Sequence, residues 1–273
     1  NTSKSILKNA DLLKNIATER VTSEFLKLIC GKDAVKILDA YRETIAVIIP
    51  EITVMFNFNQ NNIHHSYDLW QHTLTALGRI EPNPILRMTM LLHDIGKPSV
   101  KTTDNSGQSH FQGHQLESKK IADKILHRLR LPSDFINKTL LLIEYHDVRF
   151  NGSKKLMKKV MNVLGTDLTK QLLEVEHADI SAQSEYQREE KLGYLETAKT
   201  HLNEIIKDNE CFKLSQLDIH GKDVLNLGVK EGRDVGNILD YLLMLVVDAN
   251  VPNKKSILIS KAKEYIYGNQ INK

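Results

Sequence analysis

The sequence has little of what marks membrane proteins or disulfide-linked secreted proteins. Only two of its 273 residues are cysteines, Cys30 and Cys211. That is too few for a disulfide framework, and they lack the spacing of a cysteine metal site or redox motif. No apolar run approaches the ~20 residues needed to span a bilayer, and no signal-peptide pattern opens the chain. We therefore expect a cytoplasmic protein that does not associate with membranes.

Residues that break helices are also scarce, since the chain has 6 prolines and 13 glycines. Apolar residues recur at helical spacing almost throughout, rather than alternating as in strands. The sequence therefore predicts an all-α fold, a helical bundle with flanking helices at both ends. The net charge of +3 is too small to argue for nucleic-acid binding by itself. Nothing in the pattern indicates an oligomeric state.

The chain divides into three predicted segments. Residues 1–62 are expected to be a helical module with one helix ending at Gly31, a second over residues 34–48, and a loop from residue 55. Residues 63–183 carry the candidate chemistry, and residues 184–273 form a helical tail. The first residue is Asn1 rather than Met, which indicates a chain that is processed, trimmed or part of something longer.

The central motif is the run from Leu91 to Pro98, which contains His93, Asp94 and Lys97. It ends a predicted buried helix that begins near Ile85, and Pro98 prevents the helix from continuing. A histidine and a carboxylate at the end of a buried helix are costly unless a group such as a divalent cation compensates them. The alternative is an ordinary helix end with polar surface residues.

Two other side chains are predicted to lie on buried helical faces. His72 lies on the apolar face of a helix expected from Tyr67 to Ile80, capped by Ser66. A single histidine there is more often a core residue than a ligand. Asp179 continues the apolar stripe of a helix that Thr166 or Asp167 would cap, where an unpaired carboxylate is strongly disfavoured. Asp179 therefore needs a cation.

Two further histidines stand at predicted helix ends. A short hairpin is expected between residues 100 and 111, and His114 follows it at the start of a helix. His146 ends the helix that begins at Pro132. Imidazole and carboxylate ligands without thiolates suit Mn, Fe, Ni, Zn or Co, with Mg as a further candidate. Such an ion activates water for attack on a phosphoester, and Lys97 could reach a phosphate oxygen.

The order of His72, His93-Asp94 and Asp179, with the run His93-Asp94-Ile95-Gly96-Lys97, resembles the HD superfamily of metal-dependent phosphohydrolases. The resemblance implies that these four ligands hold one metal. It also implies that His114 and His146 hold a second ion, or bind or protonate the phosphate. Asp94 would bridge the two ions, and Lys97 would hold the phosphate.

Four stretches resemble the C-terminal portion of bacterial CCA-adding enzymes, which are tRNA nucleotidyltransferases related to poly(A) polymerases. They are residues 19–28, 64–72, 107–114 and 221–236. Those enzymes carry an N-terminal head with a Gly-Gly…Arg-Asp signature, which this sequence lacks. We therefore expect either a headless relative or a fragment, and no nucleotide polymerisation.

The leading hypothesis is a phosphohydrolase that acts on a nucleotide or an RNA-end phosphoester. Its catalytic residues would be Asp94, Lys97, His114 and His146, and Lys97, His110, Lys154 and Lys155 would bind the substrate. The rival hypothesis is a tRNA-binding body and tail. Lys154, Lys155, Lys158 and Lys159 would then contact phosphates, and the glycines between Gly228 and Gly236 would admit one. The lysines also fit a solvated helix face, and the glycines an ordinary turn.

Overall fold

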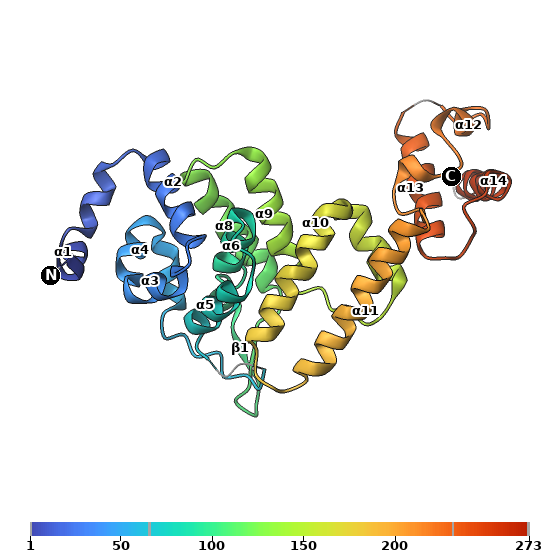
Figure 1. Ribbon diagram of the computed structural model, residues 1–273. Coiled ribbons are helices and arrows are strands. Elements are labelled where there is room, and N and C mark those ends of the chain that lie inside the picture. Colours follow the sequence, from blue (N-terminus) through green and yellow to red (C-terminus); the bar gives the residue numbers. More distant parts are fainter. Residues whose placement is uncertain (1, 65–66, 231, 272–273) are drawn as a thin grey trace. The chain divides into compact units, whose positions relative to one another are not determined.

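The computed structural model describes residues 2–64, 67–230 and 232–271, and it confirms the predicted all-α fold (Figure 1). The helices are α1 (Thr2–Lys8), η1 (Ala10–Asn15), α2 (Thr18–Ile29), α3 (Ala34–Ala40), α4 (Arg42–Ile48), η2 (Pro50–Met55), α5 (Leu69–Arg79), α6 (Pro84–Leu92), α7 (Lys97–Val100), α8 (His114–Arg128), α9 (Ser133–Tyr145), α10 (Lys154–Ala182), α11 (Arg188–Lys207), η3 (Leu214–Gln216), α12 (Gly221–Leu225), α13 (Arg233–Val247) and α14 (Lys255–Ile271). The predicted hairpin is present as β1 (Thr102–Thr103) and β2 (Ser109–His110), which pair antiparallel.

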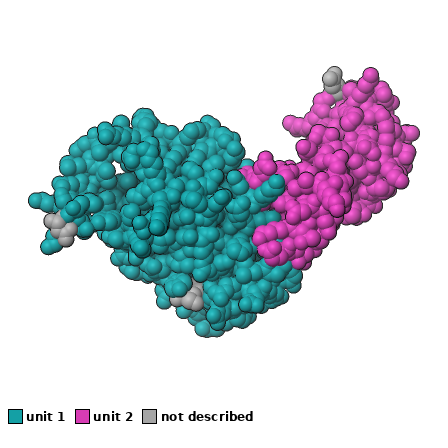
Figure 2. All heavy atoms as spheres, in the orientation of Figure 1, with its two compact units in different colours: residues 1–149, 170–195 teal, residues 150–169, 196–273 magenta. Residues whose placement is uncertain are grey.

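The chain packs into two compact units, shown in different colours in Figure 2. Unit 1 contains residues 1–149 and 170–195, and unit 2 contains residues 150–169 and 196–273. All the residues predicted to hold a metal lie in unit 1. The three-segment division at residues 62 and 183 stays a prediction. Among the described residues, no helix is long and apolar enough to cross a membrane.

Helix α6 is the central element of unit 1. Every residue from Leu86 to Leu92 is buried, and the helix packs against α2, α5 and α9. Asn83 caps its start, because the side-chain oxygen accepts from the N–H groups of Ile85 and Leu86. Each fully buried leucine or methionine stabilises the fold by about 1.5–3 kcal/mol relative to exposure. This packing fixes the helix whose end carries the central motif.

The N-terminal helices differ in detail from the predicted ones. The predicted helix over residues 34–48 is two helices, because Tyr41 departs from helical geometry (φ −119°, ψ 25°) between α3 and α4. The predicted end near Gly31 is confirmed, since α2 ends at Ile29. Within α2, Phe25 and Ile29 are buried.

Helix α5 carries His72 and begins two residues later than predicted. Its N-cap is Asp68, whose carboxylate accepts from the backbone N–H of Gln71 at 2.8 Å. Aspartate caps a helix as well as serine does, so sequence alone did not distinguish the two positions. Ser66, the predicted cap, lies outside the described residues, as does His65.

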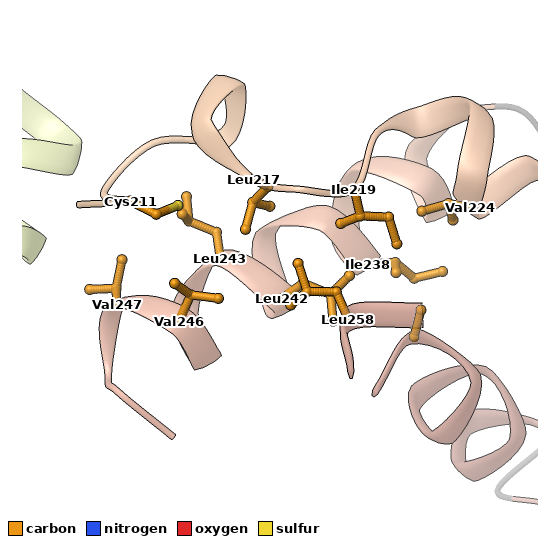
Figure 3. Close-up of a cluster of buried hydrophobic side chains, with 11 residues drawn as sticks. Cys211, Leu217, Ile219, Val224, Ile238, Leu242, Leu243, Val246, Val247 and Leu258 are labelled. Carbon is orange, nitrogen blue, oxygen red and sulfur yellow. The ribbon is translucent and has the colours of Figure 1, made fainter. Parts of the chain in front are cut away.

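Unit 2 has its own apolar core, drawn in Figure 3. Side chains of α12, α13 and α14 meet there with those of the segment around Leu217 and Ile219. Helix α13 contributes five of the eleven core residues, at positions spaced three or four apart. Helix α10 breaks at Gly165, which has non-helical torsions (φ 71°, ψ 174°). The predicted helix start near Thr166 therefore coincides with this break.

Candidate metal centre

The end of α6 and the start of α7 place His93, Asp94 and Lys97 together inside unit 1. Helix α6 ends at Leu92, and α7 begins at Lys97 with Pro98 in its first turn, a position that tolerates proline. His93 and Asp94 are 0% and 1% exposed. The sequence prediction that this pair ends a buried helix is confirmed.

One group of possible metal ligands consists of His72, His93, Asp94 and Asp179. Nε2 of His72 lies 2.8 Å from Oδ1 of Asp179 and 3.5 Å from Oδ2 of Asp94. Nε2 of His93 lies 3.1 Å from Oδ2 of Asp94 and 3.4 Å from Oδ1 of Asp179. The four ligand atoms lie within 4.8 Å of one another. Residues from α5, the end of α6 and α10 thus converge on one point.

A second group consists of Asp94, His114 and His146. His114 is the first residue of α8, and His146 directly follows α9. Their Nε2 atoms lie 3.3 Å and 3.6 Å from Oδ1 of Asp94, and 3.1 Å from each other. Oδ2 of Asp94 faces the first group and Oδ1 the second. Asp94 therefore has the geometry of a bridging carboxylate.

Backbone carbonyls fix the orientation of all four imidazole rings. The acceptors are Ala182 O for His72, Met90 O for His93, Phe111 O for His114 and Ile143 O for His146, at 3.4, 2.8, 2.9 and 2.6 Å. A carbonyl oxygen only accepts, so each Nδ1 carries a proton and donates it. With a cation bound, each ring would be neutral and would direct the lone pair of its Nε2 atom toward the cation. A hydrogen bond from the other ring nitrogen to a backbone carbonyl is typical of histidine metal ligands.

The buried charges shift the pKa values of the cluster strongly. Burial opposes protonation of His93, but the Asp94 and Asp179 carboxylates outweigh it and raise the pKa of His93 to about 10. Burial would raise the pKa of Asp94, but His93 and Lys97 hold it well below its usual range. His72 and His93 do the same for the pKa of Asp179. The carboxylates are therefore ionised and need positive charge beside them.

The donor atoms fit a divalent cation. Nε2 of His93 and both carboxylate oxygens of Asp94 are buried and have charged neighbours, but no hydrogen bond of regular geometry. The contact between Nε2 of His114 and Nε2 of His146 opposes two lone pairs unless a proton or a cation lies near them. Nitrogen and oxygen ligands of this kind suit a transition-metal ion. The cluster could therefore hold a metal ion, whose identity the ligand set does not fix.

Lys97 lies in this site and is only 6% exposed. Its Nζ atom lies 2.7 Å from Oδ2 of Asp94 and donates to Oε1 of Gln60 at 3.0 Å. The ring of Phe111 lies below the ammonium group, at 5.6 Å from its centroid. Lys97 is thus held beside the bridging carboxylate, within reach of a group bound there.

Sequence reasoning missed several polar residues around the cluster. Gln183 donates from Nε2 to Oδ2 of Asp179 at 2.9 Å, and its Oε1 accepts from Lys191 at 2.7 Å. Glu176 is buried one turn before Asp179, and burial raises the pKa of its carboxyl well above the usual range. The spacing of three and four residues from Asp179 could have indicated Glu176 and Gln183. No such pattern indicates Lys191.

The remaining predicted substrate-binding residues lie outside the cluster. His110 is in the exposed hairpin, and its ring lies 2.7 Å from Asp104. Lys154 and Lys155 lie in unit 2 and form ion pairs, Lys154 with Glu204 and Glu210 and Lys155 with Asp248. These carboxylates therefore already neutralise part of the positive charge of Lys154 and Lys155.

The glycines between Gly228 and Gly236 have open surroundings. A side chain added at Gly228, Gly232 or Gly236 would meet nothing within 4 Å. Gly228 and Gly232 have positive φ angles of 84° and 122°, which favour glycine at a turn. Residue 231 of this segment lies outside the described residues. The turn geometry thus explains two of these glycines without a bound phosphate.

Comparison with known proteins identifies the family. A family model described as "Probable RNA and SrmB- binding site of polymerase A" matches residues 1–56. A second, described as "tRNA nucleotidyltransferase domain 2 putative", matches residues 114–262. Neither description names the HD superfamily, so the HD resemblance stays a prediction.

Curated relatives agree with these models. The CC-adding tRNA nucleotidyltransferase of Thermus thermophilus is 29% identical over 251 residues, which cover 88% of this chain and 55% of the relative. The A-adding tRNA nucleotidyltransferase of Deinococcus radiodurans is 30% identical over 142 residues, 49% of this chain and 32% of the relative. A Multifunctional CCA protein of Legionella pneumophila is 27% identical over 169 residues, 57% of this chain and 40% of the relative.

The chain thus spans about half the length, or less, of the curated relatives it matches. Of the stretches that carry the predicted resemblance, residues 19–28 lie within the first family model and residues 221–236 within the second, whereas residues 64–72 and 107–113 lie between the two models. Because the second model covers more than half of the sequence, this chain belongs to the tRNA nucleotidyltransferase domain 2 family.

Proposed function

We propose that this chain is the RNA-binding body and tail of a tRNA nucleotidyltransferase, with tRNA as its partner in the cytoplasm. The match over residues 114–262 carries this proposal. The RNA-binding description of the match over residues 1–56 supports it, and so do relatives named for adding C and A to tRNA. The sequence has no Gly-Gly pair followed by Arg-Asp, so nucleotide addition is not proposed for the chain as it stands.

A tRNA-binding titration tests this proposal. Fluorescence anisotropy of labelled tRNA should show binding that weakens steeply between 50 and 200 mM salt, on the order of 10³-fold for about six phosphate contacts. A DNA duplex of similar length and charge is the control. Equal binding of the two nucleic acids, or no binding at low salt, would contradict a tRNA-specific body.

The geometry of unit 1 favours a second function, a metal-dependent phosphohydrolase site. The carrying observation is that Asp94 joins two groups of buried ligands, with His72, His93 and Asp179 on one side and His114 and His146 on the other. A divalent ion bound there would supply a Lewis acid and an activated water for cleavage of a phosphoester. The substrate would be a nucleotide or an RNA-end phosphoester.

The residues of the chain would then have distinct roles. Asp94 would bridge the ions and hold their spacing. Lys97, already beside Asp94, would neutralise charge that develops on the phosphate oxygens. His114 or His146 would bind the phosphate or protonate the leaving oxygen where only the first ligand group is filled. The buried setting strengthens each of these electrostatic interactions.

Elemental analysis of the purified chain tests the metal site first. Wild type should contain a stoichiometric transition metal, and Asp179→Ala should lose it. A screen of nucleotides and cyclic phosphates then tests for hydrolysis. If wild type hydrolyses nothing even after Mn, Fe, Ni, Zn or Co is added back, the hydrolase proposal fails and only the tRNA-binding function remains.

A further inference from the structure

A chain of hydrogen bonds leads from the metal cluster to a lysine. Oδ1 of Asp179 faces His72, while its Oδ2 accepts from Nε2 of Gln183 at 2.9 Å. Oε1 of Gln183 in turn accepts from Nζ of Lys191 at 2.7 Å. The ammonium group therefore stands two hydrogen bonds from a predicted metal ligand. None of the roles assigned above uses it.

Lys191 does not stand alone. Its Nζ atom lies 3.4 Å from Nδ1 of His64. Burial lowers the pKa of Lys191, and the positive charges of Arg149 and Lys97 lower it further. The carboxylates of Asp179 and Asp147 raise this pKa, but they do not outweigh the other effects. Burial also lowers the pKa of His64, and Lys191 and Arg149 add to that shift. Lys191 and His64 are thus in contact beside the cluster, and Arg149 lies close enough for its charge to act on both.

The cations at this position are only partly compensated. Arg149 is exposed and forms no ion pair with the residues that the structure describes. Lys191 is half-buried, and its hydrogen-bond acceptor Gln183 is neutral. Like charges held close together repel each other at low effective dielectric, and an anion bound between them removes that cost. A phosphate group is an anion that guanidinium and ammonium groups both bind well.

An aromatic face borders the same place. The ring of His64 packs on Tyr186, with centroids 5.0 Å apart and planes inclined by 56°. Tyr186 remains 45% exposed. Ser184 ties its segment to the one carrying His64, since its hydroxyl donates to Ile63 O and its backbone N–H donates to His64 O. An exposed aromatic ring beside a phosphate site suits stacking of a nucleobase.

We propose that Lys191, Arg149 and His64 form a second phosphate subsite next to the metal cluster, so that the preferred substrate is a nucleotide phosphoester carrying a second phosphate group. This inference rests on the proposed phosphohydrolase function. One phosphate would lie at the cluster beside Lys97, and the other between Lys191 and Arg149. The second phosphate belongs either to a nucleoside bisphosphate or to the phosphodiester that joins an RNA end to its chain.

Binding to the metal-depleted chain tests the subsite without any turnover. Equilibrium dialysis would compare three probes: a nucleoside 3′-monophosphate, a nucleoside 3′,5′-bisphosphate and a dinucleotide 3′-phosphate. Wild type should bind the last two at least tenfold more tightly than the first. Arg149→Gln and Lys191→Gln should each lose most of that preference, and monophosphate binding should stay the same. Lys138→Gln, which removes an exposed lysine paired with Asp134 on α9, should change nothing.

The outcomes separate this inference from the function on which it rests. Equal binding of all three probes by wild type would overturn the subsite, whether or not the chain hydrolyses phosphoesters. A retained preference in a chain that hydrolyses nothing would uphold the subsite and reject the hydrolase. Lys191→Gln also loosens Gln183, so metal content is measured in both variants. Loss of metal together with all binding in Arg149→Gln would indicate a merely structural role. Tighter binding of the bisphosphate than of the dinucleotide would indicate a free nucleotide as the substrate, and tighter binding of the dinucleotide would indicate an RNA end.

Discussion

Asp94 is the residue that the two groups of candidate metal ligands share. Its Oδ2 atom faces His72 and His93, and its Oδ1 atom faces His114 and His146. The side chain is 1% exposed, so its negative charge has no water to stabilise it. Because Asp94 belongs to both ligand groups, a substitution that removes its charge weakens both groups at once.

Asp94→Asn should therefore lose metal from both ligand groups while the helices remain. The amide has the same shape but no charge, so metal affinity should fall at least 10–100-fold, and elemental analysis measures this directly. Asp123→Asn is the matched control, because Asp123 lies on α8 in an exposed pair with His127. A stoichiometric metal in Asp94→Asn would refute the bridging role.

The two histidine groups can be separated in the same assay. His72→Ala should abolish metal binding in the first group, whereas His146→Ala should affect only the second. If two ions bind in wild type, His146→Ala should retain about one of them. Circular dichroism verifies that both variants keep their helix content. Loss of all metal from His146→Ala would show that the two groups fill only together.

At the scale of elements, Gly96 explains how α8 approaches the central motif. A Cβ added to Gly96 would lie 2.5 Å from the backbone N of Ser118 and 2.8 Å from the backbone O of His114. The backbone N–H of Gly96 also donates to Ser118 Oγ at 2.9 Å. The φ angle of Gly96 is −81°, so any residue could adopt its conformation. Glycine is needed here for space alone.

Gly96→Ala should destabilise the chain and displace His114 from Asp94. The methyl group meets backbone rather than a flexible side chain, so we expect a loss of about 1–3 kcal/mol in unfolding free energy, with weaker metal binding in the second group. Chemical denaturation measures the first effect. Gly193→Ala is the control, since an added Cβ on α11 meets nothing within 4 Å. It should be neutral or stabilise by up to about 1 kcal/mol.

Unit 2 carries an ion-pair network between α10 and two acidic residues, one after α11 and one directly after α13. Glu210 pairs with Lys154 and Lys158, and Asp248 pairs with Lys155 and Lys159. Burial would raise the pKa of Glu210, but Lys154 and Lys158 outweigh it and hold that pKa below its ordinary value of 4.5. The predicted phosphate-binding lysines thus have a structural role within their own unit.

The network predicts acid sensitivity of unit 2. Because the folded-state pKa of Glu210 is lowered, its contribution is present above the unfolded-state value and is lost as pH falls through the folded-state pKa. Glu210→Gln should lower stability by about 1 kcal/mol or less at pH 7, and the difference from wild type should shrink below pH 4.5. Thermal unfolding at several pH values measures this. A constant difference down to pH 3 would contradict the assignment.

On the scale of the whole molecule, the charges available to RNA are distributed unevenly. Lys154, Lys155, Lys158 and Lys159 all have carboxylate partners. Lys4, Lys8 and Lys32 are exposed and have no ion pair among the described residues. They also lie in the stretch that matches an RNA-binding family model. Unpaired lysines release counterions on binding phosphate without first breaking a protein contact.

Changing Lys4, Lys8 and Lys32 together to Gln should weaken tRNA binding and reduce its salt slope by up to about 2.7, or 0.9 per contact. The same change at Lys154, Lys155, Lys158 and Lys159 should have a smaller effect per residue. Anisotropy titrations over a range of salt concentrations measure both slopes. A larger loss from the second variant would support the phosphate-contact hypothesis for those lysines.

Local sequence rules determined much of this protein. Periodicity of apolar residues predicts the helices, and Gly113 marks where α8 begins. Pro98, in contrast, lies in the first turn of α7, after α6 has ended at Leu92. These rules failed where two local structures are equally compatible with the sequence, such as two possible helix caps. Asp68 rather than Ser66 caps α5 within the described residues, and Tyr41 interrupts a stretch whose pattern continues.

The six candidate ligands were also identified from sequence, since a polar side chain on an apolar stripe needs compensation. Only the tertiary structure decided how they divide into two groups that share Asp94, because that depends on the packing of α8 against Gly96. It likewise decided that the lysines of α10 face carboxylates, and that Lys191 lies beside His64. Charge pairing between distant residues leaves no local pattern, whereas burial of a helix face repeats along the chain.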